Sequence, residues 1–147
     1  MNHFYSTSDI AQLTARAKQG DPEAQYELAL KYHQGDGVQR NYRQAFYWYR
    51  HSAKQGYASA QVNLGALYHE GLGVMQDGLK ARRRYRQSAK QENLNAQYNL
   101  GQLYRFGVGF PPDLERAKKW YRKAAAQGHS AAQQVLKDLD TNQEEIA

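Results

Sequence analysis

The chain has 147 residues, a formal net charge of +6 at pH 7 and no cysteine. This length fits one domain, and the absence of cysteine excludes a disulfide framework and a thiolate metal site or nucleophile. The basic balance favours acidic partners, which include proteins, nucleic acids and anionic membranes. Because residues 1–10 lack the basic and apolar segments of a signal peptide and no run of about 18 apolar residues follows, we expect a soluble, cytoplasmic chain.

A spacing of 36 residues organises the sequence. The pair Ala24-Gln25 recurs in register, and so do a glycine pair and a tyrosine: Ala60-Gln61, Ala96-Gln97 and Ala132-Gln133; Gly35-x-Gly37, Gly71-x-Gly73 and Gly107-x-Gly109; Tyr49, Tyr85 and Tyr121. A fixed period of 20 to 50 residues is typical of solenoids, whose units are stable only when stacked. The sequence therefore predicts a single repeat domain over residues 1–147.

In chain order, we expect a lone helix over residues 9–20, which we call B-type. Three repeats follow at 21–56, 57–92 and 93–128, each with an A-type helix, a glycine-bearing connection and a B-type helix. Ala24, Leu28 and Tyr32 fall at i, i+4 and i+8, the spacing of one helical stripe. An A-type helix over 129–139 and a frayed polar tail over 140–147 complete a prediction of an all-α fold with about eight helices.

Capping residues place the helix ends. Three residues at the repeat spacing predict N-caps for the B-type helices, namely Asn41, Asp77 and Asp113. Asp21-Pro22 predicts an N-cap followed by proline at the first helical position. Gly20, Gly56 and Gly128 are expected to close B-type helices. A further column, Ala29, Gly65 and Gly101, lies inside the A-type helices and predicts close helix–helix contact.

These patterns carry a resemblance to a known family. The run Ala-Gln-Tyr-x-Leu-Gly/Ala-x-x-Tyr, then Gly-x-Gly, then Ala-x-x-Trp-Tyr and Ala-Ala-x-Gln-Gly, clearest over 96–128, resembles the Sel-one-like repeat (SLR), a relative of the tetratricopeptide repeat. The resemblance covers residues 9–139. It implies a right-handed α-solenoid of antiparallel helix pairs whose A-type helices line a concave groove for a protein partner. By analogy it also suggests a bacterial adaptor, such as a regulator, a chaperone-like protein or an immunity protein that masks an effector.

The groove-facing positions vary between repeats, as binding positions would. They are Tyr26, Leu30 and His33; Val62, Ala66 and His69; Tyr98, Gln102 and Arg105, with Gln34, Glu70 and Phe106 at the groove edge. Tyr26, Tyr98, Arg105 and Phe106 are the leading partner-binding candidates, since large side chains with a polar handle often anchor interfaces. Packing of Tyr26 and Tyr98 against the neighbouring repeat is an equally good interpretation.

Four residues depart from the repeat pattern. Lys31 stands where the other repeats have leucine, and is interpreted as a surface adaptation or a recognition residue. Arg84 replaces a tryptophan, Glu92 replaces a closing glycine, and Gly78 opens a B-type helix. The middle repeat is therefore the least typical.

Catalytic and cofactor motifs are absent from the sequence. There is no phosphate-binding loop, nucleophile elbow or metalloprotease helix, and Gly-x-Gly connects helices, so we predict a chain that is not an enzyme and has no cofactor. His33 and His69 hold equivalent positions, but no third ligand joins them, so no metal site is predicted. Titration near neutral pH is an alternative role for this pair.

A basic run gives the competing functional hypothesis. Its arginines lie on the second B-type helix, with further cations on that helix and the third: Arg82, Arg83, Arg84 and Arg86; Lys80; Lys118, Lys119, Arg122 and Lys123. Such a run is most often a solvated surface, and the alternative is binding of nucleic acid or an anionic surface through the outer helices. The expected partner is another protein or a peptide segment, for which the positive charge would favour an acidic one, and no small-molecule substrate is expected. Self-association through the open solenoid ends is a further expectation.

Overall fold

The computed structural model describes the backbone of residues 7–146 and the side chains of residues 9–142. Within that part of the chain it has eight helices and no strand. The helices are α1 (Thr7–Lys18), α2 (Pro22–Gln34), α3 (Tyr42–Lys54), α4 (Ala58–Glu70), α5 (Gly78–Ala89), α6 (Leu94–Phe106), α7 (Leu114–Ala126) and α8 (Ser130–Ile146). Residues 1–6 and 147, which the single-domain prediction includes, lie outside the described residues.

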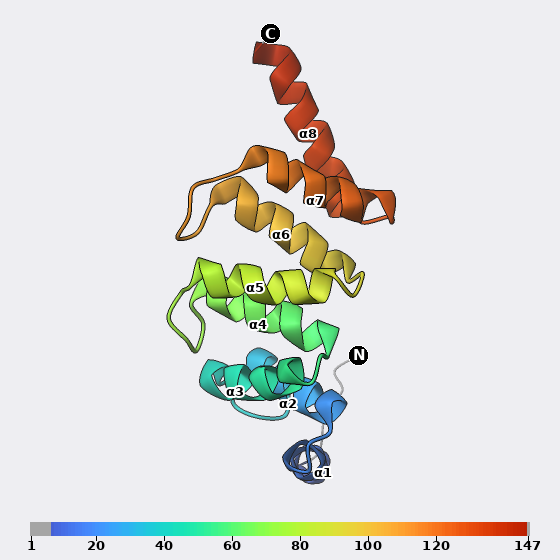
Figure 1. The fold of residues 1–147 in the computed structure, drawn as a ribbon. Coiled ribbons are helices and arrows are strands. Elements are labelled where there is room, and N and C mark those ends of the chain that lie inside the picture. Colours follow the sequence, from blue (N-terminus) through green and yellow to red (C-terminus); the bar gives the residue numbers. More distant parts are fainter. Residues whose placement is uncertain (1–6, 147) are drawn as a thin grey trace.

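The helices stack in chain order from α1 at one end to α8 at the other (Figure 1). Each packs mainly on the helices before and after it in the sequence. The even-numbered helices are A-type and the odd-numbered helices are B-type. This arrangement confirms the predicted all-α solenoid.

The last helix is longer than predicted. We expected it to end at Leu139, but α8 continues to Ile146 and projects beyond α7 (Figure 1). The segment after Leu139 contains no glycine or proline, and its glutamine and glutamates are good helix formers. Nothing in the local sequence therefore ends the helix where its apolar pattern ends.

Side-chain caps fix the helix starts as predicted. Asp21 accepts hydrogen bonds from the backbone N–H groups of Glu23 and Ala24. The side chains of Asn41, Asp77 and Asp113 each accept one hydrogen bond from the backbone N–H three residues later. The nitrogen–oxygen distance is 3.1 Å in each case.

The closing positions of the B-type helices need left-handed backbone. Gly20, Gly56 and Gly128 have φ of 97°, 90° and 95°. Glu92 holds the same column with φ of 63°, and it is the only described non-glycine residue with positive φ. The sequence departure at Glu92 thus changes the side chain but keeps the turn.

A tyrosine packs against each of the two interior glycines, which confirms the predicted close contact at Gly65 and Gly101. A Cβ atom added to Gly65 would lie 2.7 Å from the Tyr85 ring, and one added to Gly101 would lie 2.5 Å from the Tyr121 ring. Both rings are essentially fully buried. A side chain at either glycine would therefore displace the ring.

The glutamine of each Ala-Gln pair links neighbouring repeats. The Gln61 amide donates to the Ala53 carbonyl at the end of α3 and accepts from Gln91, which follows α5. Gln91 also donates to the carbonyl of Gly56. Equivalent bonds join Gln25 to Ala17 and Gln55, Gln97 to Ala89 and Gln127, and Gln133 to Ala125. We call this series the glutamine ladder.

The glycine at position 78, at the start of α5, is explained by a close steric contact. A Cβ atom there would lie 1.6 Å from the carbonyl oxygen of Val108, in the connection between α6 and α7. The glycine therefore lets this connection rest directly on the first turn of α5.

Candidate functional site

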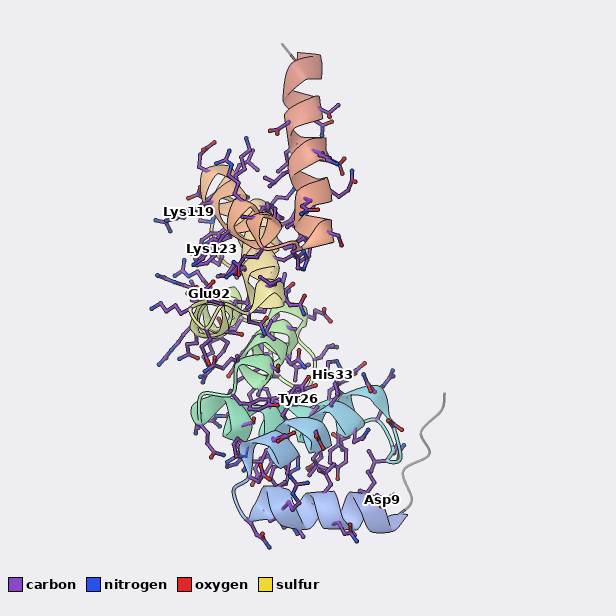
Figure 2. The ribbon with its side chains drawn as sticks, turned by 90° about the vertical axis from the view of Figure 1, so that its right-hand side faces the viewer. Asp9, Tyr26, His33, Glu92, Lys119 and Lys123 are labelled. Atoms are coloured by element: carbon purple, nitrogen blue, oxygen red, sulfur yellow. The ribbon has the colours of Figure 1, made fainter. Side chains whose placement is uncertain are left out.

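The predicted groove positions all lie on α2, α4 and α6, and we call them the A-side surface. Most are half-buried, and Val62 is buried. The three edge positions, Gln34, Glu70 and Phe106, are exposed, and 59% of the Phe106 surface is accessible. The Arg105 guanidinium lies 4.9 Å from the centre of the Phe106 ring. Figure 2 shows Tyr26 and His33 on α2, away from Lys119 and Lys123 on α7.

Polar residues of the A-side surface meet the hydroxyls of the buried tyrosines. His33 Nδ1 lies 3.0 Å from the Tyr49 hydroxyl, which also accepts a hydrogen bond from Asn63. In the next repeat, His69 Nδ1 lies 3.5 Å from the Tyr85 hydroxyl. In the third, the Tyr121 hydroxyl donates to the side-chain oxygen of Gln102. Much of the predicted binding set is thus engaged within the protein.

Burial governs the titration of these groups. It raises the pKa of Tyr121 to about 12, and raises the pKa of Tyr49 and Tyr85 further. Burial also lowers the pKa of His33 and His69, against a smaller opposing effect of Glu70. Both histidines are therefore neutral at pH 7.

Tyr26 and Tyr98 both contact the neighbouring repeat. The Tyr26 ring lies 5.2 Å from that of Tyr57, which precedes α4. The Tyr98 ring stacks on His129, which precedes α8, at 4.8 Å between centroids. These contacts are those of the packing interpretation, and a binding role for the two tyrosines stays a prediction.

Lys31 is a correction to the sequence analysis. We interpreted it as a surface or recognition residue, but only 8% of it is exposed. Its Nζ lies 3.0 Å from the Asp36 carboxylate in the connection after α2. The lysine therefore fills a buried position of the leucine column by pairing its charge with a nearby aspartate.

The basic run divides between two places. Arg82, Arg83 and Arg86 line an open cleft of 490 Å³ along α5, together with Leu79, Gln87 and Lys90. Arg84 does not line it. This half-buried residue donates a hydrogen bond to Gln87, and burial lowers its pKa. The predicted stripe of four arginines is therefore three arginines on one face and Arg84 apart.

Two further hollows adjoin this cleft. One of 270 Å³ is bounded by Arg86, Tyr104 and three residues of α7: Arg116, Lys119 and Trp120. Another of 300 Å³ is bounded by Arg82, Tyr104, Arg116 and the connection Phe110–Asp113. Shared walls join the three hollows into one region between α5 and α7, which we call the α5–α7 cleft.

Sequence reasoning missed most of this cleft. Tyr104 holds the column of Tyr32, which the sequence places on a helical stripe, and Trp120 and Phe110 are not among the site residues predicted from the sequence. The spacing of charges on α5 predicted one wall, but the other walls come from α6, α7 and their connection. Among the described residues there is no group of three or more metal-ligating side chains. No described helix is long and apolar enough to cross a membrane.

A comparison with known protein families identifies the repeats. The Sel1 repeat family matches residues 22–57, 58–93 and 94–129, which are three consecutive copies. The chain is a Sel1 repeat protein. Members of this family are generally scaffolds for protein–protein interaction, and their repeats are typically non-catalytic. The matched copies begin one residue after the boundaries predicted from the sequence.

Solved structures of similar proteins have the same fold. A Sel1 repeat protein from Oxalobacter formigenes is 40% identical, with 88% of this chain and 98% of that chain covered and a TM-score of 0.74. The protective antigen c5321 of uropathogenic Escherichia coli, which has an SLR fold, is 31% identical over 84% of this Sel1 repeat protein, with a TM-score of 0.68. The match spans 34% of the antigen.

More distant likeness concerns the fold alone. Cysteine-rich protein B (hcpB) of Helicobacter pylori is 18% identical, with 86% of this chain and 94% of that chain covered and a TM-score of 0.68. A comparison with curated proteins found no match.

Proposed function

We propose that this Sel1 repeat protein is a non-enzymatic adaptor that binds a segment of a partner protein along the A-side surface. The observation that carries the proposal is the Arg105–Phe106 pair at the end of α6. A phenylalanine with 59% of its surface exposed and a guanidinium over its ring supplies apolar area and a charged hydrogen-bond donor together. Aromatic and arginine side chains are frequent anchors of protein interfaces.

The other A-side positions fit a supporting role. Tyr26 and Tyr98 are half-buried and held by neighbouring rings, so each offers a rigid edge at little further entropic cost. Regulation of the partner would follow from covering its segment, as in a chaperone-like or immunity protein. This role rests on analogy within the family and on no residue of this chain.

A pull-down compares the A-side surface with a matched surface elsewhere. Wild type, the double variant Arg105→Ala/Phe106→Ala and the control Tyr47→Ala would each capture proteins from lysate of the source cells, with and without nuclease treatment. Tyr47 is a suitable control because it lies on α3 and is also exposed, at 50%. We expect one protein to be retained by wild type and the control and lost by the double variant.

The competing function gives a different result. A catch that disappears with nuclease, or is released between about 50 and 150 mM salt from all three proteins alike, would favour nucleic acid or nonspecific charge. Retention of the same protein by the double variant would contradict binding through the Arg105–Phe106 pair.

A further inference from the structure

The α5–α7 cleft concentrates positive charge with few carboxylates to balance it. Arg83, Arg86 and Lys119 are exposed and have no ion-pair partner among the described side chains. Asp113 is the one acidic residue that bounds the hollows, and it caps α7 and lies 3.5 Å from Arg116. A hollow lined by one sign of charge focuses the electrostatic potential and attracts anionic groups.

Glu92 does not neutralise the positive charge of the cleft. Its carboxylate lies 3.8 Å from Lys123 Nζ, so it pairs with α7 outside the hollows (Figure 2). Helix α5 itself contains no acidic residue between Gly78 and Ala89. The positive face of the cleft is therefore not neutralised by its own helix or by the turn that follows.

Aromatic rings of the cleft already hold cations. The Arg82 guanidinium lies 5.0 Å from the Phe110 ring centre, and the Arg116 guanidinium lies 5.8 Å from that of Tyr104. Lys123 Nζ lies 5.6 Å from the Trp120 ring. A stacked guanidinium keeps its N–H edge available for a carboxylate. Nucleobases, by contrast, would compete with these cations for the ring faces on which single strands depend.

The dimensions suit a short extended peptide. Leu79 and Lys90, at the two ends of the α5 wall, are separated by about 17 Å at 1.5 Å per helical residue. About five extended residues span that distance. Alternate side chains of such a segment would face the wall, where arginine can pair with carboxylates through two parallel hydrogen bonds.

We propose that the α5–α7 cleft binds an extended acidic segment of a partner protein, whose Asp and Glu carboxylates meet Arg82, Arg83, Arg86 and Lys119. This second contact surface lies on the B-type helices, so it goes beyond the proposed role of the A-side surface. One partner could use both surfaces, or each could hold a different protein.

Fluorescence anisotropy with defined probes tests the proposal. The probes are a labelled peptide with five consecutive glutamates and a labelled single strand of six thymidines, which has a similar number of charges. Each is titrated with wild type and with the cleft variant Arg82→Gln/Arg86→Gln/Lys119→Gln, at about 50 and 150 mM salt. The control variant Arg40→Gln/Arg43→Gln/Arg50→Gln removes the same charge from residues that do not line the cleft.

We expect wild type and the control variant to bind the glutamate peptide with similar affinity, and the cleft variant to bind it at least about tenfold more weakly. Circular dichroism should give the same helical spectrum for all three proteins. An equal loss in both variants would overturn the proposal in favour of nonspecific charge. Tighter binding of the thymidine strand would replace it with a nucleic-acid site, and no peptide binding by wild type at the lower salt would refute it.

Discussion

The packed contacts between successive helices, which we call the joints, and the α5–α7 cleft treat polar groups in opposite ways. In the joints, tyrosine hydroxyls meet His33, His69 and Gln102, and the glutamine ladder joins side-chain amides to each other and to backbone carbonyls. No described buried side-chain nitrogen or oxygen lacks a hydrogen bond. In the cleft, Arg83, Arg86 and Lys119 are exposed and have no ion-pair partner among the described side chains.

The difference separates residues that hold the array together from residues that are available to a partner. Substitutions in the joints should change the free energy of unfolding. Substitutions in the cleft should change binding and leave stability within about 0.5 kcal/mol, as is usual for exposed side chains.

The largest effect is expected from Gly101→Leu. The new side chain would begin 2.5 Å from the Tyr121 ring and force it out of its buried position. Overpacking typically costs about 1–3 kcal/mol, and we expect the upper end of that range because the ring or the backbone must move. Thermal unfolding followed by circular dichroism measures the loss. Lys137→Leu is the control, because Lys137 is exposed at the same column of α8, and an unchanged melting temperature for Gly101→Leu would contradict the joint.

A smaller loss is expected from Gln61→Leu. This change removes the donor to the Ala53 carbonyl and the acceptor for Gln91, in a site that is only 5% exposed. We expect a cost of about 1–2 kcal/mol in urea unfolding, the range for a buried group that loses its partner. Gln133→Leu removes one bond at an exposed position and should cost less. Equal losses of unfolding free energy for Gln61→Leu and Gln133→Leu would show that burial does not increase the contribution of the ladder to stability.

The smallest effect concerns pH. Because burial lowers the pKa of His33 and His69 below 6.5, the unfolded chain takes up protons first as pH falls. Stability is therefore full above about pH 6.5 and declines as pH falls through the lowered pKa values. Between about pH 7.5 and 5.5, the melting temperature of wild type should fall more than that of His33→Gln/His69→Gln. Equal falls would mean that these two histidines do not contribute.

The repeated columns made the fold readable from the sequence, because a residue that recurs at one spacing reports one packing environment. The caps at Asn41, Asp77 and Asp113 and the contact at Gly101 followed from that regularity. Lys31 was misjudged because its charge suggested exposure, whereas its neutralising partner, Asp36, lies in the following connection. Comparison of equivalent positions in the repeats does not show which nearby residue neutralises a charge at one of them.

The cleft could be predicted only in part, since its walls do not share a column. The arginines of α5 were visible as a charge run, but the opposite wall depends on how α7 and the Phe110–Asp113 connection lie against α5. Gly78 permits that approach through a contact with Val108 that no periodicity encodes. Non-repeating features therefore had to come from the three-dimensional arrangement.

The glutamine ladder also bears on how the array comes apart. Gln61 in α4 is bonded to the end of α3 and to Gln91, which follows the next B-type helix, so it joins two repeats. If one repeat opened, its neighbours would lose partners for groups that water cannot easily reach. Nearest-neighbour terms of this kind make a short solenoid melt as a single cooperative unit, without a populated state in which one interior repeat is open.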